Sequence, residues 1–430
     1  MSTIEEGLLA EAGGVWRLTR AVTQWAWSPD DAWLAVALAE LDGAGRSVLC
    51  VIEVDAGRIA MRVPGRTIEG IGWASPEHLV VTRAQDLGTR AILHAVPDGT
   101  VLGSVALPSL HGGRQRVAAG ASHGGVADAL LVTPWRWHGG AAQRVRHRAG
   151  YVLRVEPFEV AREVLPTAWR ALPTLPHARP MVAALEPDGT HVLFWLGEPD
   201  ATGVVGGSPG ALVRYAWQED RATLVGRAGA RVMELLCCDP TRVVLREAAG
   251  DDISARGEIA VVDAQAGDVL ARTDGGLDDV GPWATMDLHP DRERVLVAGR
   301  VARARRWVGA LREASVAPAG TGVAVEVTTA AQRAMGAVWQ GEDDALWVLT
   351  SRGADGAQIR GWPSLRAGEG AATAGWALPL EGKSPSQAHL AWSPMRTRLT
   401  VGWRCVPERA DAAQRALGVS RVAWVSLTRG

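Results

Sequence analysis

Two arginine-rich segments carry the side chains in this sequence best suited to bind a charged partner. One runs from Trp135 to Arg148, and the other runs from Arg300 to Arg306 with Trp307 directly after it. A guanidinium group beside an aromatic ring can pair with carboxylates, hold phosphate or stack on a nucleic-acid base. The candidate binding residues are Trp135, Arg136, Trp137, His138, Arg144, Arg146, Arg148, Arg303, Arg305 and Arg306.

The overall charge limits what these segments could bind. The chain has 45 basic and 47 acidic residues and a formal net charge of -2. No chain-wide field therefore recruits nucleic acid or an anionic membrane. Solvated surface loops or a site for an acidic protein partner fit these residues better than nucleic-acid or phosphate binding does.

A second pattern with possible chemistry is Gly120-Ala121-Ser122-His123-Gly124, which matches G-x-S-x-G. In a hydrolase, the serine of this motif needs a strand, a sharp turn and a helix around it. Here the apolar run from Val126 to Trp135 follows, and its composition predicts another strand. We therefore predict no catalytic residue.

The residues that commonly bind metals show no ligand spacing. The four cysteines are Cys50, Cys237, Cys238 and Cys405, with no C-x-x-C pair. They fall within or at the ends of predicted strands, which is typical of reduced, buried thiols. The ten histidines are scattered. We predict no metal site and no cofactor.

The strands that must position these segments come from a repeat. The stretch from Val22 to Glu40 consists of two apolar runs joined by Trp27-Ser28-Pro29-Asp30. Proline lacks the N–H that a central strand needs, and aspartate favours turns, so this stretch predicts a β-hairpin. Its second run, from Trp33 to Ala39, is apolar at every position. Such a strand needs a sheet on each side, as neighbouring blades of a β-propeller provide.

The hairpin recurs along the whole chain. Repeats begin near residues 22, 68, 117, 181, 232, 283, 337 and 388. A period of about 50 residues repeated this often is typical of a propeller or solenoid. We predict an all-β fold in which residues 1–430 form a single β-propeller of eight four-stranded blades. Seven blades is the alternative, if the third or sixth repeat is irregular.

The two ends of the chain predict how the ring closes. The last repeat supplies only three strands, whereas Val15 to Thr19 forms a strand without a partner in the first repeat. This N-terminal strand can complete the last blade and remove an exposed sheet edge. Residues 1–14 then form an acidic leader.

The Trp-Ser-Pro-Asp turns and the Asp-Gly turns between third and fourth strands resemble those of WD40-like and TolB-like propeller repeats. The resemblance covers essentially the full chain, although no Trp-Asp dipeptide closes a third strand. The chain also resembles bacterial propellers that are encoded with a MoxR-type AAA+ ATPase and a von Willebrand A-type protein. That resemblance implies an ATPase-associated adaptor.

Long connections on one face of the disc predict a binding surface, because variable loops on a rigid scaffold commonly carry function. They are Arg136 to Arg148, Glu198 to Gly210, Ala248 to Gly257, Arg300 to Arg306 and Pro407 to Val419. We expect a non-enzymatic protein–protein interaction scaffold. The alternative is an enzyme or a small-ligand or phosphate binder with its site at the mouth of the central channel. No secretory signal or membrane span is evident, so we expect a cytoplasmic protein without membrane partners.

Overall fold

The structure is a computed structural model of the 430-residue chain. It describes residues 8–11, 15–39, 46–86, 88–108, 110, 115–119, 122–123, 126–134, 150–164, 179–186, 188–199, 205–228, 231–239, 241–248, 257–273, 277, 286–303, 306–317, 325–329, 334–351, 357–373, 375–378, 388–404 and 420–426. The statements that follow concern these residues.

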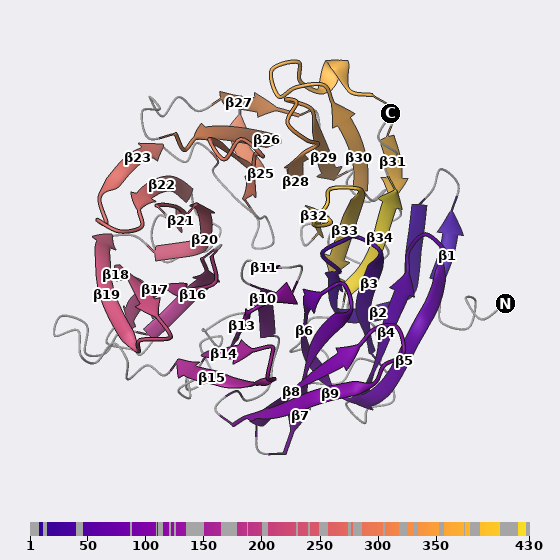
Figure 1. The fold of residues 1–430 in the computed structure, drawn as a ribbon. Coiled ribbons are helices and arrows are strands. Elements are labelled where there is room, and N and C mark those ends of the chain that lie inside the picture. Colours follow the sequence, from indigo (N-terminus) through magenta and orange to yellow (C-terminus); the bar gives the residue numbers. More distant parts are fainter. Residues whose placement is uncertain are drawn as a thin grey trace.

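Eight antiparallel blades stand around a common centre, each with four strands from the inside to the rim, and the first and last blades join in one continuous sheet (Figure 1). Blade 1 contains the second half of β2 (Val15–Trp27), β3 (Trp33–Ala39), β4 (Arg46–Glu53) and β5 (Arg58–Arg66), and blade 2 contains β6 (Ile68–Ser75), β7 (His78–Gln85), β8 (Gly88–Ala95) and β9 (Val101–Leu107). Blade 3 contains β10 (Gln115–Ala119), β13 (Ala129–Pro134), β14 (Gly150–Arg154) and β15 (Glu159–Val164), and blade 4 contains β16 (Arg179–Leu185), β17 (His191–Pro199), β18 (Val205–Ala216) and β19 (Arg221–Ala228).

Blade 5 contains β20 (Arg231–Asp239), β21 (Arg242–Ala248), β22 (Gly257–Asp263) and β23 (Val269–Thr273), and blade 6 contains β24 (Asp287–Leu288), β25 (Arg294–Arg303), β26 (Arg306–Ser315) and β27 (Val325–Thr328). Blade 7 contains β28 (Ala334–Trp339), β29 (Leu346–Ser351), β30 (Ala357–Trp362) and β31 (Gly375–Leu378), and blade 8 contains β32 (Ala388–Trp392), β33 (Arg398–Arg404), β34 (Ser420–Ser426) and the first half of β2. The prediction of an all-β propeller with eight blades is confirmed, and the seven-blade alternative is wrong. The third and sixth repeats, which that alternative supposed to be irregular, each form a four-stranded sheet.

Strand β3 shows why the blades must pack on one another. It is buried from Leu34 to Ala39. Its even-numbered residues, such as Leu34 and Val36, pack with Trp424 of blade 8. Its odd-numbered residues, such as Ala35, pack with Val81 of blade 2. Alternate side chains of a strand point to opposite faces, so one strand contributes to two inter-blade cores.

The turns between first and second strands share one chemistry. In blade 1 the Ser28 backbone N–H donates to Trp33 O at 2.9 Å, and the Asp31 N–H donates to Ser28 O at 3.1 Å. Asp31 adopts a left-handed conformation, with φ at 61°. The ring of Pro29 fixes the backbone at the start of the turn, and an aspartate such as Asp31 tolerates the left-handed conformation at its end. The sequence Ser-Pro-Asp-Asp therefore favours this turn. Equivalent hydrogen bonds and positive φ values recur at Gly189, Arg292 and Arg396.

A single 13-residue strand closes the ring. The first half of β2 pairs with β34, with Leu18 opposite Val422, and its second half pairs with β3, with Trp27 opposite Leu34. In Figure 1 the yellow C-terminal strand β34 lies beside the indigo β2. The predicted closure by the N-terminal strand is therefore confirmed. The expectation of a leader over residues 1–14 is wrong in part, because β1 (Leu8–Glu11) pairs with β2 as an added outer strand of this blade.

A buried carboxylate reinforces the closure on the side of the turns. Asp31 of blade 1 is only 4 % exposed. It accepts hydrogen bonds from the turn of blade 8: from Ser393 Oγ at 2.5 Å, Met395 N at 3.0 Å and Thr397 Oγ1 at 2.7 Å. Hydrogen bonds to a charged acceptor are stronger than neutral ones, so this contact holds the first and last blades together.

We expect Asp31→Ala to lower the free energy of unfolding by about 2–3 kcal/mol, because several donors of blade 8 lose a charged acceptor. Asp31→Gly removes the same carboxylate without left-handed strain, so its free energy of unfolding should be about 1 kcal/mol higher than that of the alanine variant. Urea unfolding followed by tryptophan fluorescence measures both. Asp343→Ala, at an exposed position in the corresponding turn of blade 7, is the control. Equal effects at Asp31 and Asp343 would contradict the proposed role of the contact.

Candidate functional site

The first arginine-rich segment lies outside the described residues. Trp135, Arg136, Trp137, His138, Arg144, Arg146 and Arg148 all fall within residues 135–149, which connect β13 to β14. The connection joins the second strand of blade 3 to the third. Such connections leave the disc on the same face as the connections between blades. We call this the connection face, and the opposite one, which carries the first-to-second and third-to-fourth turns, the turn face.

The second arginine-rich segment is a β-hairpin where the sequence predicts a loop. Strands β25 and β26 stay in register to their ends, with Arg300 opposite Gly309, Ala302 opposite Trp307 and Arg303 opposite Arg306. Arg305 is outside the described residues, as is the side chain of Arg303. The structure thus brings Arg303 and Arg306 together on the connection face.

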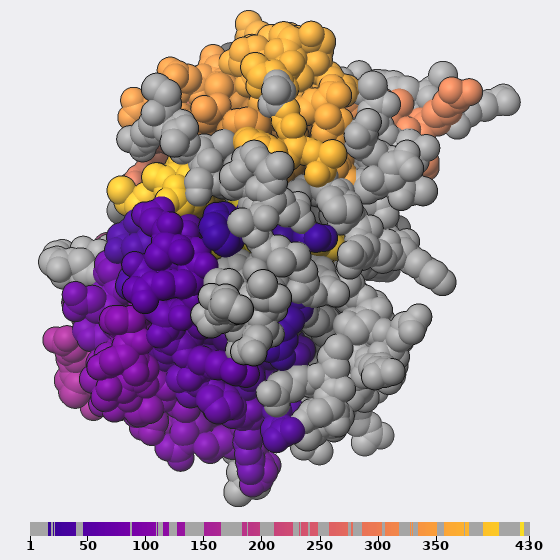
Figure 2. All heavy atoms as spheres, turned by 90° about the vertical axis from the view of Figure 1, so that its right-hand side faces the viewer, coloured from indigo at the N-terminus to yellow at the C-terminus, as the bar shows by residue number. Residues whose placement is uncertain are grey.

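The outward face of this hairpin carries an arginine stacked on an exposed tryptophan. Arg300 Cζ lies 4.1 Å from the centroid of the Trp307 ring. Trp307 remains 45 % exposed, and Arg306 beside it is exposed. The hairpin, in salmon, projects beyond the disc at the upper right of Figure 2. A cation over a tryptophan ring stabilises by about 0.5–1 kcal/mol at an exposed site and fixes the direction of the guanidinium.

The G-x-S-x-G segment does not form a nucleophile elbow. Ser122 and His123 form β11, which pairs in an antiparallel ribbon with β12 (Val126–Ala127). The apolar run predicted as one strand is thus divided between β12 and β13. The described residues around Ser122 contain no strand-turn-helix element, so the ribbon gives no support to a catalytic Ser122.

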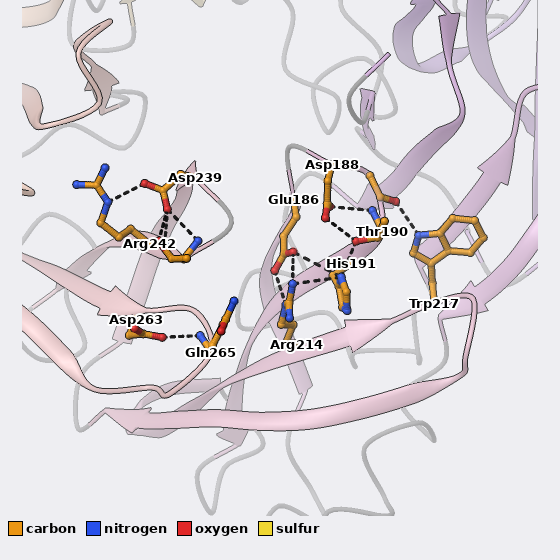
Figure 3. A network of polar contacts seen from close by, with 12 residues as sticks. Glu186, Asp188, Thr190, His191, Arg214, Trp217, Asp239, Arg242, Asp263 and Gln265 are labelled. Atoms are coloured by element: carbon orange, nitrogen blue, oxygen red, sulfur yellow. Dashed lines mark hydrogen bonds and ion pairs between the residues drawn. The ribbon is translucent and has the colours of Figure 1, made fainter. Parts of the chain in front are cut away.

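A polar cluster on the turn face of blade 4 was not among the predicted sites. Glu186 is buried, and its two carboxylate oxygens accept from Arg214 Nε and Nη2, both at 2.7 Å. His191 Nδ1 lies 3.6 Å from the same carboxylate, and Asp188 accepts from Thr190 (Figure 3). The signal for this cluster is Glu186 itself, which stands before a proline where other repeats have serine.

The side chains of Glu186, Asp188 and His191 lie close enough together to hold a metal ion. The donor set does not fit one, because Arg214 already occupies both oxygens of Glu186 and places a positive charge at the site. The same hydrogen bonds raise the pKa of Arg214 above its usual range. The cluster is therefore a structural ion pair between strands.

In several repeats the residue before the turn proline uses its side chain to stabilise the turn. Ser28 Oγ accepts from Trp33 N at 2.9 Å, Ser393 Oγ accepts from Arg398 N at 3.0 Å, and His289 Nδ1 accepts from Asp291 N at 3.2 Å. In blade 5 the corresponding Asp239 accepts from Arg242 Nε at 2.7 Å (Figure 3). Polar side chains that bond to the backbone nearby favour turns. Much of the charge on the turn face is thus used within the blades.

We expect Arg214→Ala to lower the free energy of unfolding by about 3–5 kcal/mol, because it leaves the buried Glu186 carboxylate without its partner. Arg221→Ala is the matched control on the next strand. Arg221 pairs with Glu219, but both are exposed, so its removal should cost less than about 1 kcal/mol. Chemical denaturation measures both variants. Adding Glu186→Gln to Arg214→Ala should restore part of the loss, and no restoration would contradict this account.

The two adjacent cysteines are poor nucleophiles. Burial raises the pKa of the Cys237 thiol to about 12 and that of the Cys238 thiol to about 11. A thiol must lose its proton to react, so both are protonated and inert near neutral pH. Cys50 and Cys238 are buried, Cys237 is half-buried, and Cys405 lies outside the described residues.

At the centre of the turn face, an arginine ties three blades together. Arg396 of blade 8 donates to Trp339 O of blade 7 at 2.8 Å and to Leu288 O of blade 6 at 3.0 Å. Its guanidinium lies 3.7 Å from Asp287, which accepts from Trp339 N at 2.7 Å. These polar groups are the ones that the alternative hypothesis, a site at the channel mouth, would use.

Burial raises the pKa of Asp287 from an ordinary 3.8 to about 6, although Arg396 acts in the opposite direction. The folded state therefore binds a proton more tightly than the unfolded state does. The resulting stability is fully present below about pH 4 and is lost as the pH rises through 6. The shift corresponds to roughly 3 kcal/mol.

We expect Asp287→Asn to remove this pH dependence, because asparagine stays neutral and can still accept from Trp339 N. Relative to the variant, the wild-type chain should lose stability between pH 4 and pH 6, as measured by melting temperature across that range. Asp291→Asn is the control, because the stability that Asp291 contributes should change with pH in the opposite direction. Burial raises the pKa of Asp291, but hydrogen bonds from Glu293 N and the Arg294 side chain outweigh burial and lower it. A pH-independent difference between the wild type and Asp287→Asn would contradict the raised pKa.

Comparison with known proteins finds relatives in structure only. No family model and no curated protein matches the sequence. Sqt1 of Chaetomium thermophilum superposes with a TM-score of 0.58 at 14% identity, covering 95% of this chain and 95% of that one. Its complex with the N-terminus of ribosomal protein L10 gives 0.57 at 13% identity, covering 95% and 97%. The Dos1 propeller gives 0.55 at 12% identity, covering 96% and 94%.

The fold is that of a WD40-like β-propeller. At these identities the likeness of this propeller to its neighbours concerns the fold alone. Among the described residues of the propeller, no helix combines the length and the apolar character needed to cross a membrane.

Proposed function

We propose that this propeller is a non-enzymatic scaffold that binds a protein partner on its connection face. The observation that carries the proposal is the exposed Trp307, with the half-buried Arg300 stacked on it, on a hairpin that projects beyond the disc. Tryptophan and arginine are enriched among the residues that dominate binding energy at protein interfaces. A rigid ring holds such residues in place, which reduces the entropy lost on binding.

The chemistry of the turn face favours a scaffold over an enzyme. Glu186, Asp287 and Arg396 make hydrogen bonds that join strands or blades. The half-buried Cys237 and the buried Cys238 thiols are held protonated. The channel-mouth alternative would need such groups to be directed at a substrate, whereas here they satisfy one another and the backbone.

The neighbours in structure agree with this proposal at the level of fold. Sqt1, a propeller of the same kind, has been seen bound to a segment of ribosomal protein L10. In its finer form the proposal is a cytoplasmic adaptor for an acidic partner, in a bacterial system with a MoxR-type AAA+ ATPase and a von Willebrand A-type protein. The resemblance of the repeats to such propellers supports this form.

The experiment is affinity purification of the tagged full chain from its native host, with quantitative mass spectrometry. We expect a stoichiometric protein partner that is lost when residues 136–148 are replaced by a Gly-Ser linker or when Arg306→Glu and Trp307→Ala are combined. The control changes the turn face, where Met395→Ala removes an exposed side chain and should keep the partner. Loss of the partner in the Met395 variant alone would move the site to the opposite face. Absence of any stoichiometric partner from the wild type would refute the scaffold proposal.

A further inference from the structure

The outer strand of blade 2 is a sheet edge without the residues that usually protect one. Strand β9 has β8 as its single strand neighbour in the part of the chain that the structure describes. It reads V-L-G-S-V-A-L, with no charged residue and no proline. Charged side chains, proline and short length are common devices that keep an edge from pairing with another chain. The outward backbone groups of β9 are therefore available to a further strand.

The outer strands of other blades carry the protection that β9 lacks. β5 has three arginines and a proline, and β15 has two glutamates and an arginine. β31 is uncharged but only four residues long. β23 of blade 5 begins with the same exposed Val-Leu pair as β9, but Arg272 follows and pairs with Glu258. Strand β23 is thus a natural comparison for β9.

One side of β9 is exposed and mostly apolar. Val101 and Leu102 are 56 % and 50 % exposed, and Ser104 and Ala106 are exposed as well. On the other side, Leu107 is buried in the core between blades 2 and 3. Successive side chains of a strand alternate between its faces. A strand added to β9 would therefore place every second side chain beside Leu102, Ser104 and Ala106.

An arginine without a carboxylate partner lies over this exposed side. Arg90 of β8 stands opposite Ala106 in the ladder and donates from Nη1 to Ser104 Oγ at 3.1 Å. Its guanidinium thus reaches the strand at the edge. Among the described residues no carboxylate pairs with Arg90, and Asp86, the acidic residue that precedes it in the hairpin, pairs with Arg66.

A second arginine adds to this positive charge. Arg83 of β7 stands directly opposite Arg90 and is only 8 % exposed. Its guanidinium donates to Pro64 O and Val63 O, both at 3.3 Å, and burial lowers its pKa. Carbonyl groups accept these hydrogen bonds without neutralising the charge. Like charges at opposed positions weaken a strand pair, so a carboxylate brought to Arg90 would relieve their repulsion.

We propose that blade 2 binds an extended segment of a partner protein as a fifth strand along β9. The segment carries a carboxylate opposite Ser104, where it pairs with Arg90. Apolar residues two positions before and after that carboxylate pack on Leu102 and Ala106. Backbone hydrogen bonds to β9 provide affinity, and the side chains provide specificity. The surface lies on the rim of the disc, so this inference goes beyond the connection-face proposal and does not depend on it.

A second copy of the chain fits this edge less well than an acidic strand does. If β9 paired antiparallel with β9 of a copy about a two-fold axis at Ser104, the two Arg90 side chains would approach each other across the axis. Such a pair would add positive charge where the edge already has an excess. The charge on β8 therefore favours a partner with a carboxylate.

The test uses the purified full chain and a fluorescein-labelled nine-residue peptide. The peptide has glutamate at its centre, valine two and four positions away on each side, and threonine elsewhere. We expect fluorescence polarisation to show binding that Arg90→Gln weakens about fivefold. Leu102→Asn should weaken it to a similar extent, whereas Leu270→Asn, the matched change in β23, should leave it unchanged. Hydrogen exchange of residues 101–107 should slow when the peptide is bound.

Further controls separate charge pairing from misfolding and from general attraction. Exchanging the peptide's glutamate for lysine should weaken binding to the wild type about tenfold, and Arg90→Glu should reverse this preference. Arg221→Gln, at an exposed arginine on the outer strand of blade 4, should bind the glutamate peptide as the wild type does. Leu102 is exposed and Arg90 is half-buried, so the variants should keep the wild-type melting temperature.

Several results would overturn the proposal. They are unchanged hydrogen exchange of residues 101–107 with excess peptide, equal binding by the wild type and Arg90→Gln, or equal losses in the Leu102 and Leu270 variants. Sedimentation in which the chain alone forms a dimer that Leu102→Asn dissociates would instead make this edge an interface between copies.

Discussion

Burial of the second strands on both faces is the constraint on which this structure depends. Each fully buried valine or leucine side chain stabilises by about 1.5–3 kcal/mol, and strand β3 alone places Leu34, Val36 and Leu38 against blade 8. Its alternate residues pack on blade 2. A blade on its own would expose two apolar faces, so no blade is stable without a neighbour on each side. A closed ring provides a neighbour everywhere, and this requirement brings the N-terminal strand to the last blade.

The polar groups of the turn face follow from the same requirement. Sheets packed face to face need contacts that fix their relative positions, and the turns supply them. Asp31 joins blade 1 to blade 8, Arg396 joins blade 8 to blades 6 and 7, and Arg294 pairs with Asp344 across blades 6 and 7 at 2.5 Å. Because these groups are satisfied internally, the turn face has less unpaired charge to offer a partner. The hairpin of blade 6 is the contrasting feature on the other face.

Local signals in the sequence predicted the architecture well. Pro29 and the apolar run from Trp33 to Ala39 were enough for a hairpin buried on both faces, and their recurrence was enough for eight blades. The contacts between turns could not be predicted, because Asp31 and Ser393 are far apart in the sequence, and their turn motif predicts the local turn but not a partner in another blade. The hairpin at Arg300 to Arg306 was mistaken for a loop, because its tip has the polar composition of loops and only the register of β25 and β26 reveals strands. Glu186 and Arg214 were missed for a related reason: Glu186 before its turn proline is a signal, but its pairing with Arg214, 28 residues away, leaves no local pattern.

The strand β2 has a consequence for how the protein is made. Its first half pairs with β1 on one edge and with β34 on the other, and β34 is the last strand that the structure describes. At synthesis rates of roughly 5–20 residues per second, β34 leaves the ribosome tens of seconds after β2. During that interval β1 can cover one edge of β2. The other edge stays unpaired, and the apolar face of blade 1 that packs on blade 8 stays exposed. The growing chain is therefore an open arc until β34 has been made, and the risk of aggregation through these edges falls only when that strand pairs with β2.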